Sequence, residues 1–428
     1  MFTKIILASI FLLSISAFCQ VEQFSSREKN YGEVVYSQDI VNFFSIKEGQ
    51  TRVDLFVQVP YKNLQFVKSD DGFTAKYEVT ASIYDSSQSK LFIEKTWSET
   101  INVIDYNMAT TKGNYNITKK SFDLTPGAYF IKTTLEDLDS RKTSNQGTPF
   151  IVKDLNEKIS FSDILLVTSD SSAATNNSIL PNVSRNILST KDKMELYFEV
   201  KSKDTTEASL LFEYKIANIE DTVIQKSTEN RVIKPGLNQI LYTMPEFPLE
   251  LGAYTITISV SDSIGQNLST IKKNFYSRSK GLPYIITDID KAIEQTRYIA
   301  SSEELDYMEE GKTQAEKTKR FLEFWKKKDP SPNNDENEIF DEYYRRVAYA
   351  NANFSNYREG WISDRGMVLI LLGVPNNVDR HPFEYDSKPY EIWEYYNINK
   401  SFIFLDETGF GDYRLMTPLT GDLYRYRY

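Results

Sequence analysis

The sequence predicts a mainly β protein with an α+β C-terminal part: two tandem Ig-like β-sandwiches, followed by a helical segment and a small antiparallel sheet. Three observations predict this fold class. Apolar residues alternate with period two over about residues 31–152, and do so again over about residues 159–276. The apolar spacing changes to that of helices after Pro283, and short strand-like runs return beyond Gly360.

The N-terminal residues have the three parts of a secretory signal peptide. Lys4 supplies the positive charge, residues 5–13 are apolar, and residues 17–19 place small residues where a signal peptidase requires them. We therefore predict a signal peptide over residues 1–19 and export to the periplasm, to the outer membrane or out of the cell. Alternatively, a lipidated Cys19 would become the mature N-terminus and tether the chain to a membrane.

Composition narrows the possible partners. Cys19 is the only cysteine, so a chain cleaved after it has no disulfide, no thiolate nucleophile and no cysteine metal ligand. The net charge of −10 repels phosphate backbones, so nucleic acid is not an expected partner. No later segment is apolar for long enough to form a transmembrane helix. The remaining length suggests about three domains, which we place at residues 20–155, 156–280 and 281–428.

In the first predicted sandwich, alternating residues mark strands with one face in a core. The inward sets are Val53, Leu55, Val57 and Val59, then Tyr77, Val79, Ala81 and Ile83. In the second, residues 194–200 and 209–216 have the same character. Six residues of the first region recur at a constant offset of 125: Leu124, Gly127, Ala128, Tyr129, Ile131 and Asp137 reappear as Leu249, Gly252, Ala253, Tyr254, Ile256 and Asp262. This repetition suggests a duplicated domain, although turn chemistry alone could produce it.

Three helices are predicted next. Ser301 and Glu304 form a capping box for the first. The second has apolar residues at helical spacing from residue 318 to Trp325 and ends in three lysines, which we interpret as a solvated cap suited to the helix dipole. The third begins at about Asp335. Strands are predicted at 367–372, where the continuous apolar run indicates burial of both faces, and at 390–396 and 402–406.

Residues 360–366, Gly-Trp-Ile-Ser-Asp-Arg-Gly, resemble the signature of the GWxTD-domain proteins. Ser363 stands where that signature has threonine, a change that keeps the hydroxyl and loses a methyl group. The similarity extends over about the last third of the chain, through Trp325 and residues 329–330, 342–351, 373–375, 390–393 and 408–414. The resemblance implies an exported bacterial protein of a family without an established activity.

The segments that carry this resemblance provide the candidate binding or structural motif. Its residues are Gly360, Trp361, Asp364, Arg365, Gly366, Gly373, Pro375, Trp393, Tyr395, Gly409, Gly411, Asp412 and Tyr413. In a structural interpretation, Trp361 anchors a loop in the core, the glycines allow unusual backbone angles, and Asp364 with Arg365 forms a charged corner. In a functional interpretation, these side chains form the floor of a ligand pocket.

No catalytic constellation is evident. The single histidine, His381, is expected in an exposed loop without a cysteine partner or a serine elbow, and we predict neither a metal site nor a cofactor. Asp406, Glu407 and Asp412 crowd near one turn and could act as paired carboxylates on a glycoside, but we favour a solvated turn because acidic residues are frequent throughout the chain. No phosphate-binding glycine loop is present.

The last five residues, 424–428, alternate tyrosine with arginine. They could close the small sheet, pair with a partner strand or stack on sugars. We therefore hypothesise a non-enzymatic interaction or assembly module of the cell envelope, with the sandwiches as spacers and the C-terminal domain docking an envelope protein. The alternative is an extracytoplasmic glycan-binding protein or a carboxylate-based hydrolase.

Overall fold

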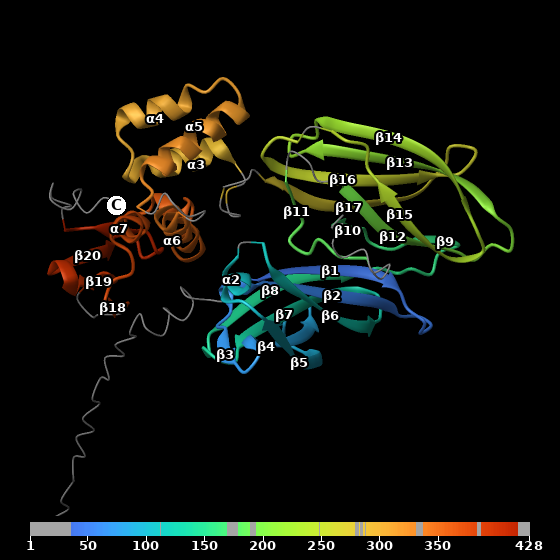
Figure 1. Ribbon diagram of the computed structural model, residues 1–428, viewed down its shortest axis with the longest axis horizontal. Helices are drawn as coiled ribbons and strands as arrows, with labels where there is room; N and C mark the ends of the chain where they lie inside the picture. The colour runs from blue at the N-terminus through green and yellow to red at the C-terminus, as the bar shows by residue number, and fades with distance from the viewer. Residues whose placement is uncertain are drawn as a thin grey trace, which may run out of the picture.

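The computed structural model describes residues 36–111, 113–168, 179–188, 194–247, 249–278, 282, 286, 288–330, 337–382 and 387–417. The predicted signal peptide and the alternating residues 424–428 lie outside the described residues. The chain is mostly β, with 50% strand and 21% helix, and has a helical segment and a small antiparallel sheet near its C-terminus. Figure 1 shows two β-rich bodies and the helical part beside them. The predicted fold class is confirmed.

The first sandwich packs a three-stranded sheet against a larger one. The small sheet contains β1 (Ser37–Phe44), β2 (Thr51–Pro60) and β6 (Tyr115–Leu124). The large sheet contains β3 (Val67–Ser69), β4 (Gly72–Asp85), β5 (Leu91–Val103), β7 (Gly127–Asp137) and β8 (Thr143–Val152). A short helix, α2 (Tyr106–Thr110), follows β5. All eight predicted inward residues of β2 and β4 have 0% exposure, so the strand periodicity identified this core correctly.

The second sandwich has the same plan. Its small sheet contains β9 (Ile159–Phe161), β10 (Leu165–Thr168), β12 (Met194–Ser202) and β15 (Gly236–Thr243). Its large sheet contains β11 (Asn186–Leu188), β13 (Ala208–Asn218), β14 (Val223–Ile233), β16 (Gly252–Ser261) and β17 (Asn267–Arg278). The order β17-β16-β13-β14 matches β8-β7-β4-β5 of the first sandwich.

The repeated sequence segment forms the same corner in both sandwiches. The Tyr129 hydroxyl donates to the carbonyl of Thr125, and the Tyr254 hydroxyl donates to the carbonyl of Glu250, each at 3.0 Å. Both tyrosines lie near the start of the equivalent strand, β7 or β16, which is the arrangement known as a tyrosine corner in immunoglobulin-like folds. The matching strand order and corner support duplication of one sandwich.

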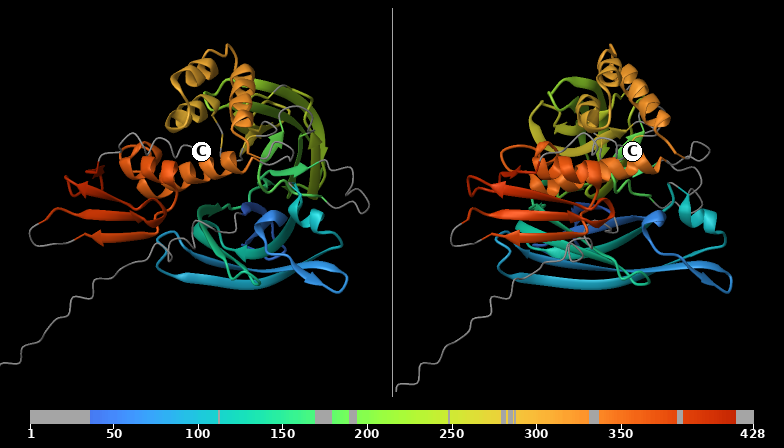
Figure 2. Two further views of the ribbon diagram at one scale, coloured as in Figure 1. Left: turned by 60° about the vertical axis from the view of Figure 1, so that its left-hand side comes forward. Right: turned by 90° about the vertical axis from the view of Figure 1, so that its left-hand side faces the viewer.

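The two sandwiches lie side by side, with the outer faces of their small sheets in contact (Figures 1 and 2). The apolar part of this junction is formed by Val41, Phe43, Phe56, Leu165, Val167, Val183 and Tyr197. Lys273 of β17 donates to both carboxylate oxygens of Asp39 at 2.7 Å, and both side chains are buried. Asn42 donates to Asp163 at 2.6 Å. Because the sandwiches do not stack end to end, they form one broad unit with a shorter reach than two spacers in line.

The C-terminal part begins with α3 (Ile289–Gln295), α4 (Ser302–Glu309), α5 (Gln314–Lys327) and α6 (Glu338–Phe354). Then follow the 3-10 turn η3 (Gly360–Ile362), α7 (Asp364–Leu372), β18 (Asn377–His381), β19 (Tyr390–Tyr395), β20 (Lys400–Asp406) and β21 (Tyr413–Leu415). The strands form one antiparallel sheet in chain order. The predicted helices and the capping box of Ser301 with Glu304 are confirmed. None of the helices in the described part of the chain has the length and apolarity that a membrane span requires.

The strand prediction for residues 367–372 was wrong, because these residues belong to helix α7. Val368, Leu369, Ile370 and Leu371 are all buried, since α7 packs against α6 and also contacts β21. A short apolar run that is buried on every side has no periodicity to separate strand from helix. The informative residue was Ser363, whose Oγ accepts from the backbone N–H of Gly366 at 3.0 Å as the N-cap.

The expectation of an exposed loop for His381 was also wrong. His381 ends strand β18, and its side chain is only 18% exposed. The imidazole stacks on Tyr390 at a centroid distance of 4.3 Å, and its Nε2 lies 3.0 Å from Asp379. Cross-strand stacking with the residue opposite it in β19 explains its partial burial.

Candidate functional site

The two glycines of the signature allow backbone segments to approach closely. A Cβ on Gly360 would lie 1.9 Å from the carbonyl oxygen of Ala350 in α6, and a Cβ on Gly366 would lie 2.0 Å from the carbonyl oxygen of Gly360. No side chain can occupy those positions without moving the backbone. The signature therefore brings η3 against α6, and α7 against η3.

Trp361 fixes this junction from inside the core and has 0% exposure. Its backbone N–H donates to Asn351 at 3.0 Å, its indole N–H donates to Glu359 at 2.6 Å, and its carbonyl accepts from the Tyr298 hydroxyl at 3.0 Å. The guanidinium of Arg297 lies 4.6 Å from the ring centroid. Trp361 thus joins the segment after α3 to the end of α6.

Asp364 and Arg365 are each engaged by other partners instead of by one another. The carboxylate of Asp364, at the first turn of α7, accepts from the backbone N–H of Leu415 in β21 at 2.8 Å. The Arg365 guanidinium donates to Glu391 of β19 at 3.2 Å. It also lies between the rings of Phe354 and Tyr413, at 4.8 and 4.1 Å. Both residues connect the helical layer to the small sheet.

Most other predicted motif residues complete the same core. Trp393 is 1% exposed and donates to the buried carboxylate of Glu391 at 3.0 Å. The Tyr395 hydroxyl donates to the carbonyl of Gly373 at 2.8 Å, and Gly373 ends α7 with a φ of 79°. Pro375 is buried in the connection to β18. These residues close the domain and offer no accessible floor for a ligand.

The turn between β20 and β21 is held by Asp406. Its carboxylate accepts from the backbone N–H groups of Thr408, Gly409 and Gly411, at 3.2, 2.9 and 2.6 Å. Burial alone would raise the pKa of Asp406, but these hydrogen bonds and that of the Thr408 hydroxyl outweigh burial and lower it below its usual value. Asp406 is thus an ionised structural anchor.

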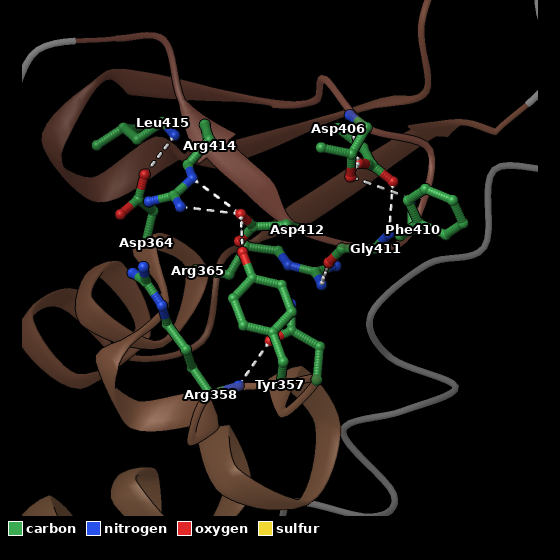
Figure 3. A network of polar contacts seen from close by, with 12 residues as sticks. Tyr357, Arg358, Asp364, Arg365, Asp406, Phe410, Gly411, Asp412, Arg414 and Leu415 are labelled. Carbon is green, nitrogen blue, oxygen red and sulfur yellow. Dashed lines mark hydrogen bonds and ion pairs between the residues drawn. The ribbon is translucent and has the colours of Figure 1, made fainter.

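Asp412 follows the same turn and is partly buried (Figure 3). It accepts from the Tyr357 hydroxyl at 2.6 Å and from the Arg414 guanidinium at 2.9 and 3.1 Å. The tyrosine hydrogen bond and the positive charge of Arg414 lower the pKa of Asp412. A carboxyl that must donate a proton in glycoside hydrolysis needs a raised pKa. The pKa values of Asp406 and Asp412 are both lowered instead of raised. Glu407, the third predicted carboxylate, is exposed to solvent.

Figure 3 shows Tyr357, Arg358 and Arg414 near Asp412, whereas Phe410 lies apart from them beside Asp406; we call the turn with these four side chains the Phe410 face. Phe410 is 87% exposed and Tyr357 is 68% exposed. The sequence motif included the neighbours Gly409, Gly411 and Asp412 but omitted Phe410 itself, Tyr357 and Arg358. An aromatic residue between two glycines in a polar turn was the available signal for Phe410.

A second feature is a polar cleft of about 650 Å³ at one end of the second sandwich. It lies between the β12–β13 loop and the β16–β17 loop, and Glu157, Asp204, Glu207 and Asp262 contribute to its lining. Asp204 pairs with Lys158 at 2.9 Å, and Asp262 accepts from the N–H groups of the turn that follows it. No aromatic side chain lines the cleft.

Within the described residues, no group of three or more His, Cys, Asp or Glu side chains is arranged to hold a metal ion.

The GWxTD domain family model matches residues 252–411, so the C-terminal part of this chain is a GWxTD domain, as its signature predicted. The match begins in strand β16 of the second sandwich, upstream of the predicted domain boundary at residue 281. No curated protein sequence matches the chain.

Solved structures give only remote likenesses. Red sea bream transglutaminase is 11% identical, with a TM-score of 0.20, over 60% of this chain and 33% of its own. A calcium-binding mutant of Bacteroides uniformis beta-glucuronidase 2 is 10% identical, with a TM-score of 0.22, over 55% of this chain and 27% of its own. A putative beta-galactosidase from Bacteroides fragilis is 11% identical, with a TM-score of 0.22, over 55% of this chain and 33% of its own. The chain spans a third or less of these structures, and the low scores carry no functional argument.

The structural role of Asp406 leads to a prediction. We expect Asp406→Asn to lower the free energy of unfolding of the C-terminal domain by about 1–3 kcal/mol at neutral pH, because the amide nitrogen cannot accept from a backbone N–H. The pKa of Asp406 is lower in the folded state than in the unfolded state. The stability that its carboxylate contributes is therefore fully present at pH values above the unfolded-state pKa of about 4, and it is lost as the pH falls through the folded-state pKa. Urea denaturation at pH 7 and pH 3 should show a smaller deficit at pH 3. An equal deficit at both would contradict the assigned role.

Proposed function

We infer that this protein is an exported, non-enzymatic interaction module of the bacterial cell envelope, whose GWxTD domain docks a protein partner through the Phe410 face. The observation that supports this proposal most directly is the exposure of two aromatic side chains on this face, Phe410 and Tyr357, the second of which lies near Arg358 and Arg414. Aromatic residues and arginine are enriched at protein interfaces relative to other surfaces. The signature residues Asp364 and Arg365 fix the small sheet, which carries this turn, against helix α7.

Two further observations support docking over catalysis at this face. Asp406 and Asp412 are both held ionised by hydrogen bonds, so neither has the properties of a general acid. The side-by-side sandwiches with their buried junction form a broad base that would position the GWxTD domain. Export and an envelope location rest on the signal-peptide pattern and on the family resemblance.

A second candidate function is glycan binding in the cleft of the second sandwich. Glu157 and Glu207 would bind the glycan, because carboxylates can accept hydrogen bonds from sugar hydroxyls. We rank it second because no aromatic side chain is available there for stacking on a sugar ring.

The test is chemical crosslinking of the tagged full-length protein in its native envelope, followed by mass spectrometry, for wild type, Phe410→Ala and Ile264→Ala. Ile264 is a matched control, because it is 85% exposed at the tip of a turn that Asp262 holds in the same way. The proposal expects one defined protein partner, lost from Phe410→Ala and kept by Ile264→Ala. Recovery of no protein, combined with retention on purified cell-wall glycan that Glu207→Gln abolishes, would reject docking and favour the cleft.

A further inference from the structure

One face of the C-terminal sheet carries a partly exposed apolar strip. Helices α6 and α7 pack on the other face, against the buried side chains of Trp393, Phe402 and Phe404 (Figure 2). Because side chains alternate along a strand, the residues next to these three point to the outer face. Ile392 lies directly opposite Ile403, which is 41% exposed. We call this surface the Ile403 strip, and its residues are Tyr390, Ile392, Ile403, Leu405 and Met416.

A carboxylate borders the Ile403 strip. Asp379 in β18 is directly opposite Ile392, so both side chains point to the outer face. Oδ2 of Asp379 lies 3.0 Å from Nε2 of His381, whereas Oδ1 is shielded from water and has no hydrogen-bond donor among the described residues. The Asp379 side chain as a whole is 35% exposed, so a further donor can approach it. A shielded carboxylate oxygen is stabilised by a cationic donor that replaces the missing water.

The chain leaves the sheet beside this strip. The Thr417 hydroxyl accepts from the backbone N–H of Ile403 at 3.1 Å. The far edge of β21 is closed to a further strand at Leu415, because its N–H donates to Asp364 and α7 contacts β21 there. Residues 418–428 reach about 36 Å when extended, whereas the three strand spacings of the sheet cover about 14 Å. The segment after Thr417 is therefore long enough to cross the strip.

The chemistry of residues 424–428 is complementary to that of the strip. Three tyrosines alternate with two arginines there, within a chain whose net charge is −10. In an extended segment the tyrosines lie on one side, where their rings can cover an apolar surface and keep their hydroxyls in water. The long arginine side chains can extend past the edge of the segment to a neighbouring carboxylate.

We propose that residues 418–428 fold back across the sheet, with the tyrosines on the Ile403 strip and an arginine paired with Asp379. The strip is then a binding site for an extended aromatic and arginine-containing segment, which the chain itself supplies. The covalent connection at Thr417 selects this occupant over a separate protein, because it gives the segment an effective concentration on the order of millimolar. The charge of Asp379 disfavours a lipid surface, since it repels phosphate headgroups. This inference does not depend on docking through Phe410.

The first measurement places the photocrosslinking residue benzoylphenylalanine at position 426 of the purified full-length protein. Position 307 is the control, because Tyr307 is also a tyrosine, is 44% exposed and belongs to α4, away from the small sheet. Illumination is followed by sequencing of the crosslinked peptides. We expect position 426 to link to residues 390–405 of the same chain, at a yield that does not depend on protein concentration. Position 307 should not reach those residues.

Two sets of variants test the contacts. Ile403→Asp should lower the yield from position 426 about tenfold, whereas Ile362→Asp, at a site with a similar exposure of 37%, should leave it unchanged. Replacing both Arg425 and Arg427 by glutamate should lower the yield about fivefold. Both arginines lie beyond the described sheet, so this change tests the contact even where Ile403→Asp impairs folding. Adding Asp379→Lys to the double glutamate variant should restore the yield.

The alternatives give different results. Position 426 linking to residues 390–405 no more than position 307 does would overturn the inference. Links that form only between two copies, at a yield that rises with protein concentration, would show that the strip is an interface between copies instead. The same measurement in the native envelope would also overturn it if position 426 reached only lipid or another protein. Absence of rescue by Asp379→Lys would reject the pairing of an arginine with Asp379. Recovery of a Phe410-dependent partner is unaffected by any of these results, so the proposed function is tested separately.

Discussion

Trp361→Ala is expected to lower the free energy of unfolding of the GWxTD domain by about 3–5 kcal/mol, the range for truncating a buried tryptophan. The ring has 0% exposure, so its removal leaves a cavity. The substitution also leaves Glu359 without the indole hydrogen bond and Arg297 without the ring beneath it. Urea denaturation followed by the fluorescence of Trp325 and Trp393, both in this domain, measures the effect.

Ile362→Ala is the matched control, because Ile362 is adjacent to Trp361 in η3 but is 37% exposed. We expect a loss of less than about 1 kcal/mol for this control, since little apolar area is removed from the core. Equal effects of the two variants would show that Trp361 does not anchor the junction. Because Trp361→Ala destabilises the domain, loss of a partner from that variant alone would not locate a docking site. The exposed Phe410 can be changed without this complication.

The strands of both sandwiches could be predicted because their inward residues alternate along the chain. Val53, Leu55 and Val57 have no exposure, and they face a core that belongs to their own sandwich. The packing of one sandwich on the other could not be predicted. It depends on residues such as Phe56, which belongs to the junction cluster and not to the core of its own sandwich. Phe56 is buried by residues of β10 and β12, and the spacing within one strand contains no information about them.

The location of the GWxTD signature could be predicted from residues 360–366, but the partners of its side chains could not. Asp364 bonds to the backbone of Leu415, and Arg365 bonds to Glu391, each across a long stretch of sequence. The pairing of Asp364 with Arg365 was inferred from adjacency, which is a poor guide at a helix start because neighbouring side chains point in different directions. The Ser363 cap was local, and its serine performs the role that the threonine of the signature would perform.

Lys273→Met is expected to destabilise the paired sandwiches by about 3–5 kcal/mol at pH 7, because it leaves Asp39 buried without its positive partner. Asp39 is 5% exposed, and in the wild type both of its oxygens accept from Lys273 at 2.7 Å. Lys272→Met is the control, because Lys272 is the adjacent residue of β17 and is exposed. Urea denaturation followed by far-ultraviolet circular dichroism, which reports on the strands, measures both variants.

The effect of Lys273→Met should depend on pH in a direction that Asp39 determines. Burial raises the pKa of Asp39, although Lys273 opposes that rise, so removing Lys273 raises the pKa further. When the pKa of a carboxyl is higher in the folded state than in the unfolded state, its contribution to stability is fully present at pH values below the unfolded-state pKa, here about 4. That contribution is lost as the pH rises through the folded-state pKa. The deficit of Lys273→Met should therefore shrink from pH 7 toward pH 4, where a protonated Asp39 needs no cation. A deficit that grows on acidification, or one matched by Lys272→Met, would show that the ion pair does not hold the sandwiches together.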